Sequence, residues 1–154
     1  MEKNFNYRSW VEIDVNKLKN NVNGIKKYLY DNEDIIAVIK ANAYGHDDAS
    51  MAVALHEAGI NNFAVASLNE AKNIRSKIND SSIVILGYTP YAKADELVKY
   101  NICQTITSKE YLENLYKYSK EKIKIHIAID TGMARIGLSA KNVGESIKLI
   151  EAAM

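Results

Sequence analysis

Three side chains able to bind anions or form covalent bonds stand in two short segments, AVIKANAYGH (37–46) and IDTGMARIG (129–137). Lys40 ends an apolar run, and Tyr44 follows it four residues later, so we expect both where a strand ends. A lysine held in a partly desolvated site loses preference for its ammonium form, and the neutral amine can form a Schiff base with an aldehyde. A lysine that ends a strand and only reaches solvent would give the same pattern.

Arg135 is the third of these side chains, and it follows a strand-like segment through a Thr-Gly turn. Its planar guanidinium is suited to a carboxylate or phenolate oxygen. Strands one and five of an eight-stranded barrel lie opposite each other, so Lys40 and Arg135 would face across one barrel mouth. The pair predicts a site for an anionic small molecule, although similar glycine turns end many strands.

The elements that would position these residues are short apolar runs separated by helical patterns. We predict helices between the runs and a final helix after the last one. This alternation predicts βα units with a parallel sheet, either open or forming part of a barrel. A further strand-like piece, WVEIDV (10–15), precedes a helix over 16–29. The predicted strands cover 35–40, 63–67, 82–87, 103–107 and 124–130, and the later helices cover 47–60, 68–78, 93–101, 108–122 and 142–153.

Two further residues with reactive side chains are interpreted as structural. Isoleucines alternate with mixed residues over 123–130, so in a barrel the isoleucines would pack under the helices and His126 would point inward. We interpret His126 as a core histidine with its hydrogen bonds satisfied, and a catalytic role stays the alternative. Cys103, within ICQTIT, is interpreted as a buried core thiol, because a catalytic thiol needs a nearby base.

Composition predicts an ordinary globular protein of one domain, with 47% apolar residues over 154 positions. A net charge of +1 argues against a nucleic acid or a membrane held mainly by electrostatics. No apolar run approaches the length of a membrane span, and no metal site is predicted. The single cysteine excludes an internal disulfide, and a reducing cytoplasm is the expected location.

Three segments, RSWVEIDVNKLKNNV, AVIKANAYGH and IDTGMARIG, together resemble the N-terminal barrel part of alanine racemase. This family uses pyridoxal 5'-phosphate (PLP) and includes serine racemases of vancomycin-resistance systems. The resemblance covers the whole chain, 1–154. It implies an α/β fold, a partial (β/α)8 TIM-type barrel of PLP fold type III. About five βα units follow a short N-terminal strand and helix, and the remaining barrel strands and the C-terminal β domain are absent.

The resemblance also implies roles for the three residues. The lysine matching Lys40 carries PLP and is one of two catalytic bases, acting on the α-proton on the D-face. The tyrosine matching Tyr44 hydrogen-bonds the cofactor phosphate. The arginine matching Arg135 contacts the phenolic oxygen of PLP and the substrate carboxylate. The implied reaction interconverts L- and D-alanine, or serine, to supply D-amino acids for peptidoglycan, in a full-length protein that is a homodimer.

Two residues depart from the family pattern. Ala128 stands where many alanine racemases have a carbamylated lysine that braces the arginine, and Asp47 stands where glycine is usual. Because only about five of the family's eight barrel strands are matched, we expect an incomplete barrel with an open edge. We expect such a chain to racemise its substrate poorly or not at all. Two alternatives stay open: a non-catalytic PLP-binding barrel protein, and a structural remnant that self-associates.

Overall fold

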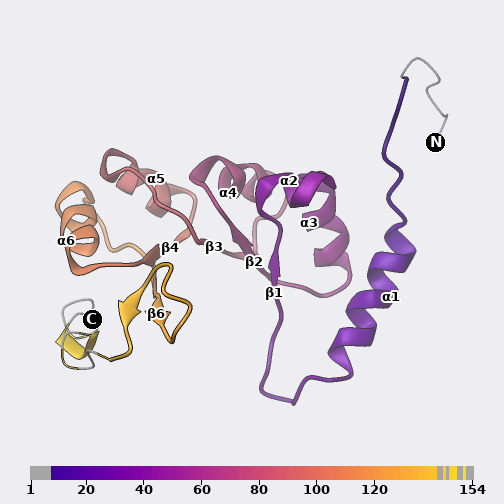
Figure 1. The fold of residues 1–154 in the computed structure, drawn as a ribbon. Coiled ribbons are helices and arrows are strands. Elements are labelled where there is room, and N and C mark those ends of the chain that lie inside the picture. Colours follow the sequence, from indigo (N-terminus) through magenta and orange to yellow (C-terminus); the bar gives the residue numbers. More distant parts are fainter. Residues whose placement is uncertain (1–7, 142–143, 145, 149–150, 152–154) are drawn as a thin grey trace.

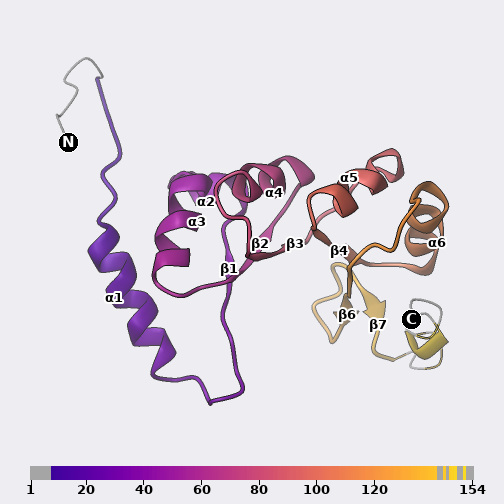
Figure 2. The same ribbon diagram turned by 180° about the vertical axis from the view of Figure 1, so that it is seen from behind.

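The fold is built on a five-stranded parallel sheet, and the computed structural model describes residues 8–141, 144, 146–148 and 151. Figures 1 and 2 show helices following the row of strands from α3 to α6, with α1 beside α3. The elements are α1 (Val15–Lys26), β1 (Ile36–Val38), α2 (Lys40–Gly45), α3 (Asp48–Glu57), β2 (Asn62–Val65), α4 (Leu68–Arg75), β3 (Ser82–Ile85), the 3-10 helix η1 (Tyr91–Lys93), α5 (Ala94–Lys99), β4 (Cys103–Ile106), α6 (Lys109–Tyr118), β5 (Ile125–Ile127), β6 (Ile129–Asp130) and β7 (Leu138–Ser139).

The strands lie in the order β1-β2-β3-β4-β5, and every neighbouring pair is parallel. This confirms the predicted βα units and the parallel sheet. The row is open, because β1 and β5 are its two outer strands and do not pair with each other. β6 and β7 form a separate two-stranded parallel sheet. The predicted helices over 16–29, 47–60, 68–78, 93–101 and 108–122 correspond to α1, α3, α4, α5 and α6.

The two faces of the sheet differ in burial. Phe63 pairs in register with Ile83, and both side chains are almost completely buried. On the opposite face, Ile36 and Val38 of the outer strand β1 are 49% and 43% exposed, whereas Ala64 and Val84 of the inner strands are buried. Because side chains alternate along a strand, one face therefore carries the apolar core and the other lies partly open. The open face is the one that would line the interior of a closed barrel.

Polar side chains begin several helices where the sequence predicts a start. The Ser108 hydroxyl accepts a hydrogen bond from the backbone N–H of Tyr111 at 3.1 Å, so Ser108 is the N-cap of α6, at the first residue of the helix predicted over 108–122. Ser67 and Glu70 form a capping box at the start of α4. These bonds satisfy N–H groups that have no partner within the first turn of a helix.

Three predicted elements need comment. The predicted strand over 10–15 is wrong: residues 10–14 form no strand, and the Asp14 carboxylate caps α1 by accepting from the amides of Asn16 and Lys17. The predicted strand over 124–130 is divided at Ala128, whose carbonyl turns to accept from Leu138 at 2.8 Å. The final helix, predicted over 142–153, falls largely outside the described residues.

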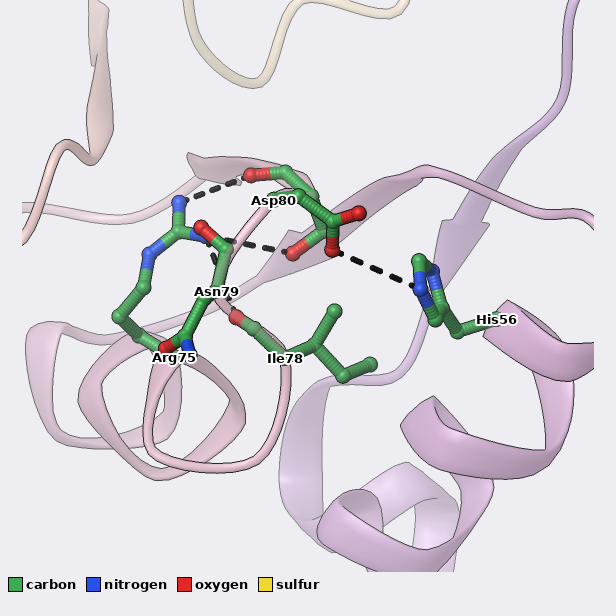
Figure 3. A network of polar contacts seen from close by, with 6 residues as sticks. His56, Arg75, Ile78, Asn79 and Asp80 are labelled. Atoms are coloured by element: carbon green, nitrogen blue, oxygen red, sulfur yellow. Dashed lines mark hydrogen bonds and ion pairs between the residues drawn. The ribbon is translucent and has the colours of Figure 1, made fainter.

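A buried arginine joins the segments that enter β3 and β4. The Arg75 guanidinium, 9% exposed, donates to the carbonyl oxygens of Ile78, Asn79 and Ser81 at 2.8–3.2 Å (Figure 3). It also donates to the carbonyls of Tyr100 and Asn101, which follow α5. Burial lowers the pKa of Arg75, and the nearby Asp80 carboxylate partly opposes that shift. One side chain therefore supplies hydrogen-bond donors to the backbone carbonyls that follow two helices, α4 and α5.

Candidate functional site

Lys40 lies immediately after β1, at the carboxyl edge of the sheet. The Ile39 amide donates to the Ala64 carbonyl at 3.0 Å, so the pairing of β1 with β2 continues up to the residue before Lys40. The Lys40 side chain is partly exposed, and no hydrogen bond or ion pair joins its ammonium to another described residue. The predicted position of Lys40 at the end of a strand is thus confirmed. Among the described residues, its amine has no competing carboxylate.

The four residues after Lys40 form a left-handed turn. Ala41, Asn42, Ala43 and Tyr44 all have φ between 50° and 56°, and none of them is glycine. Left-handed geometry costs L-amino acids about 1–2 kcal/mol per residue. Several strained residues in a row persist only where surrounding contacts determine the conformation, and such strain is concentrated at functional sites.

Hydrogen bonds within the segment close this turn. The Ala43 amide donates to the Ile39 carbonyl at 3.0 Å, and the Asp47 amide donates to the Asn42 carbonyl at 3.1 Å. The Asn42 side-chain oxygen accepts from the Asp48 amide at 3.0 Å. The turn therefore leads directly into α3. Tyr44 remains 61% exposed, so its phenol is open to an external group.

Asp47 occupies a position with left-handed backbone geometry at the start of α3. Its φ is 68°, in the left-handed region, and it is the N-cap of α3. Its carboxylate accepts from both the amide and the hydroxyl of Ser50, and these bonds lower the pKa of Asp47. The capping bonds offset the conformational cost of a side chain at this position.

The loop that carries Arg135 is organised by Asp130. The Asp130 carboxylate accepts from the amides of Gly132 at 2.9 Å and Ala134 at 3.0 Å, and the bond from Ala134 is the main cause of its lowered pKa. Gly137 has φ 114°, and a Cβ there would lie 3.0 Å from the Ala128 carbonyl oxygen. Only glycine fits without distortion. Arg135 itself is exposed.

The three predicted site residues lie after two different strands, and in the described structure no hydrogen bond or ion pair joins their side chains. Lys40 and Tyr44 follow β1, and Arg135 follows β6, which continues the chain from β5. Because β1 and β5 are the outer strands of an open row, Lys40 and Arg135 stand at opposite ends of that row. The predicted placement across one closed mouth stays a prediction.

His126 and Cys103 require correction. Ile123, Ile125 and Ile127 pack against the core as predicted, but His126 is exposed on the open face rather than satisfied in a core. No described strand covers that face at β5. Cys103 is half-buried on the same face and not in the core, and burial raises the pKa of its thiol. A raised pKa disfavours the nucleophilic thiolate.

Sequence reasoning missed the left-handed turn and the second function of Glu70, whose carboxylate bonds the Ala41 amide at 2.9 Å. The Ser67–Glu70 spacing was a readable sign of a capping box, but a bond across 29 positions leaves no local pattern. Among the described residues, no cluster of three His, Cys, Asp or Glu side chains could hold a metal ion. No described helix is long and apolar enough to cross a bilayer.

Parallel βα units with a lysine at the carboxyl edge define a barrel-type α/β protein, here with five strands in the main sheet. Residues 13–154 match the model of the alanine racemase N-terminal domain, and the chain belongs to that family.

Two curated relatives and one solved structure illustrate the similarity. Alanine racemase 1 of Clostridium acetobutylicum is 42% identical over 131 residues, covering 83% of this chain and 34% of the relative. Alanine racemase 1 of Bacillus subtilis is 35% identical over 149 residues, covering 96% of this chain and 38% of that relative. The crystal structure of alanine racemase from Bacillus anthracis with bound L-Ala-P superposes with a TM-score of 0.86 at 34% identity.

That superposition covers 98% of this chain and 40% of the Bacillus anthracis chain. The present chain therefore spans between about a third and two fifths of the length of these relatives. Its five-stranded sheet corresponds to the N-terminal barrel part of alanine racemase structures.

Proposed function

We propose that this chain forms the lysine-bearing part of a PLP-dependent racemase that interconverts L- and D-alanine or serine. The observation that carries the proposal is Lys40, followed by a strained left-handed turn, at the carboxyl edge of a sheet that belongs to the alanine racemase family. This is the edge at which βα barrels place their reactive groups. We further infer a cytoplasmic homodimer for the full-length protein, supplying D-amino acids for peptidoglycan.

The chemistry of the three side chains fits PLP. Lys40 offers a primary amine without a carboxylate partner among the described residues, and it would bond the aldehyde carbon. The Tyr44 hydroxyl would donate to the phosphate, and Arg135 would donate to the phenolic oxygen or to the substrate carboxylate. Both side chains are exposed in this chain and can reach an external anion. When bound, PLP would supply an electron sink for the substrate α-carbon.

The reaction assigns this chain one proton transfer. Lys40 Nζ would take the α-proton in the D-to-L direction, and in the L-to-D direction it would deliver a proton to that same face. Racemisation also requires a second base on the opposite face, and the remaining barrel strands would have to complete the cofactor site. Without them, we expect the isolated chain to racemise alanine poorly or not at all. We also expect PLP to react with Lys40 in preference to the exposed lysines.

Borohydride trapping tests this proposal. The purified chain is mixed with PLP, reduced, digested and mapped by peptide mass spectrometry. We expect one pyridoxyl group per chain on Lys40, because the site selects that amine over the exposed lysines. Lys40→Met should abolish this labelling. Lys124→Met, which removes an exposed lysine next to β5, should leave it unchanged.

Labelling spread over many lysines, or undiminished in Lys40→Met, would show that this chain does not form a selective cofactor site. Selective labelling combined with rapid alanine racemisation by the purified chain would contradict the inactivity that we expect of it. Selective labelling that no amino acid prevents when it is added before the reduction, even with the rest of a related racemase supplied in trans, would favour the non-catalytic PLP-binding alternative.

A further inference from the structure

Glu70 uses both carboxylate oxygens to hold backbone amides at the carboxyl edge of the sheet. Oε2 accepts from the amides of Ala66 at 2.7 Å and Ser67 at 3.2 Å, which is the capping-box side of its role. Oε1 accepts from the amide of Ala41 at 2.9 Å. Capping α4 requires only Oε2. The second oxygen is bonded to the residue that follows Lys40.

The bond to Ala41 joins two neighbouring strands at the point where each ends. Ala66 follows β2, and Ala41 lies just after β1, which pairs with β2. The Ala41 amide lies at the start of the left-handed turn, where N–H groups have no partner within the turn. The Glu70 carboxylate satisfies this amide, and a charged acceptor makes a stronger bond than a neutral one.

Asn73, one helical turn after Glu70, holds the other end of the same segment. Its Nδ2 donates to Asp48 Oδ1 at 2.7 Å, and Asp48 is buried. Residues three apart on a helix share one face. One face of α4 thus contacts the segment 41–48 at its first and last residues, and the strained turn lies between these two anchors.

We propose that Glu70 is a positioning residue for Lys40. By fixing the Ala41 amide, it fixes the plane of the Lys40–Ala41 peptide and keeps the turn left-handed. Without this bond the residues after Lys40 would relax toward right-handed geometry, and the direction of the Lys40 side chain would change. The part of the proposal that concerns reactivity rests on the proposed PLP function. The part that concerns the turn does not.

The test compares Glu70→Ala with Ser67→Ala, because both remove the capping box and only the first removes the bond to Ala41. The first readout is hydrogen exchange of the Ala41 and Ala43 amides, measured by NMR without PLP. We expect Glu70→Ala to accelerate exchange at least tenfold at these amides. Ser67→Ala should leave their exchange within about twofold of the wild-type rate, after correction for any change in global stability.

The second readout is the fraction of borohydride-trapped pyridoxyl group found on Lys40. We expect it to fall severalfold in Glu70→Ala and to stay at the wild-type level in Ser67→Ala. Glu70→Gln keeps one acceptor oxygen and the side-chain length, so it should restore part of both readouts and provides a folded variant if Glu70→Ala unfolds.

Equal effects of Glu70→Ala and Ser67→Ala on both readouts would overturn the proposal and leave Glu70 as a helix cap only. Unchanged exchange at Ala41 in Glu70→Gln and Glu70→Ala would overturn it as well. If the wild-type chain shows no selective labelling of Lys40, the proposed PLP function fails. The exchange experiment still decides whether Glu70 holds the turn.

Discussion

The two edges of the parallel sheet are held by opposite kinds of polar group. At the carboxyl edge, the carboxylates of Asp47 and Glu70 accept from backbone amides, and the Asp130 carboxylate does the same in the loop after β6. At the amino edge, Arg75 donates to five backbone carbonyls that follow α4 and α5. The carboxyl edge also contains the strained turn. The amino edge contains the buried cation.

This difference follows from the direction of the helices. In parallel βα units each helix begins at the carboxyl edge of the sheet and ends at the amino edge. Free N–H groups and a partial positive charge therefore collect at the first edge, and free carbonyls with a partial negative charge collect at the second. Carboxylates and a guanidinium are the matching partners. The carboxyl edge also carries the proposed site for an external anion, whereas the Arg75 side chain is fully occupied with the protein itself.

The largest effect is expected at the amino edge. Arg75→Met should lower the free energy of unfolding by about 3–5 kcal/mol, because several buried carbonyls lose their donor at once. The measurement is urea unfolding followed by circular dichroism. Lys77→Met removes an exposed cation two residues away and should change stability by less than about 0.5 kcal/mol.

A small effect of Arg75→Met would show that water can replace the guanidinium at these carbonyls. It would also remove the proposed contrast between a rigid amino edge and a strained carboxyl edge. If the variant folds, its pyridoxyl labelling should remain selective for Lys40, since no described bond of Arg75 reaches the carboxyl edge.

Two alanine-to-glycine substitutions, expected to change the free energy of unfolding by smaller amounts and in opposite directions, test the strain in the turn. Ala41→Gly should stabilise the chain by about 0.5–1 kcal/mol, because glycine adopts positive φ without steric cost. Ala54→Gly, in the right-handed helix α3, should destabilise it by about 1 kcal/mol or more. Urea midpoints of the two variants measure the difference directly. The same sign for both substitutions would mean that the turn is not strained.

Sequence patterns predicted the strands and helices better than the turn and the hydrogen-bond network at the two edges of the sheet. Short apolar runs marked β1 to β5, and a helical pattern beginning at Ser108 marked α6, because these signals are local. The left-handed turn was not predictable from Ala41 to Tyr44, since these residue types prefer right-handed geometry and contacts with α4 help to hold it. The Arg75 network was missed for a related reason: its acceptors extend from residue 78 to residue 101.

The smallest expected effect concerns pH, and it involves the first turn of α5. Hydrogen bonds from Lys72, at 2.7 Å, and then from Lys93 lower the pKa of Glu96 from 4.5 to about 2. The pair stabilises the fold fully above pH 4.5, where Glu96 is ionised in both the folded and the unfolded chain. As pH falls from 4.5 toward about 2, the unfolded chain takes up the proton first, so this stabilisation is progressively lost.

Glu96→Gln should therefore lower stability at pH 7 by less than about 1 kcal/mol, since the ion pair is partly exposed. The difference from wild type should shrink as pH falls and vanish near pH 2, which urea midpoints measured between pH 2 and 7 would follow. Glu113→Gln is the control, because its carboxylate lies 3.6 Å from an exposed Lys109, and it should change stability at pH 7 by less than about 0.5 kcal/mol. A Glu96→Gln difference that stays constant down to pH 2 would instead indicate that packing, not charge, fixes α5 against α4.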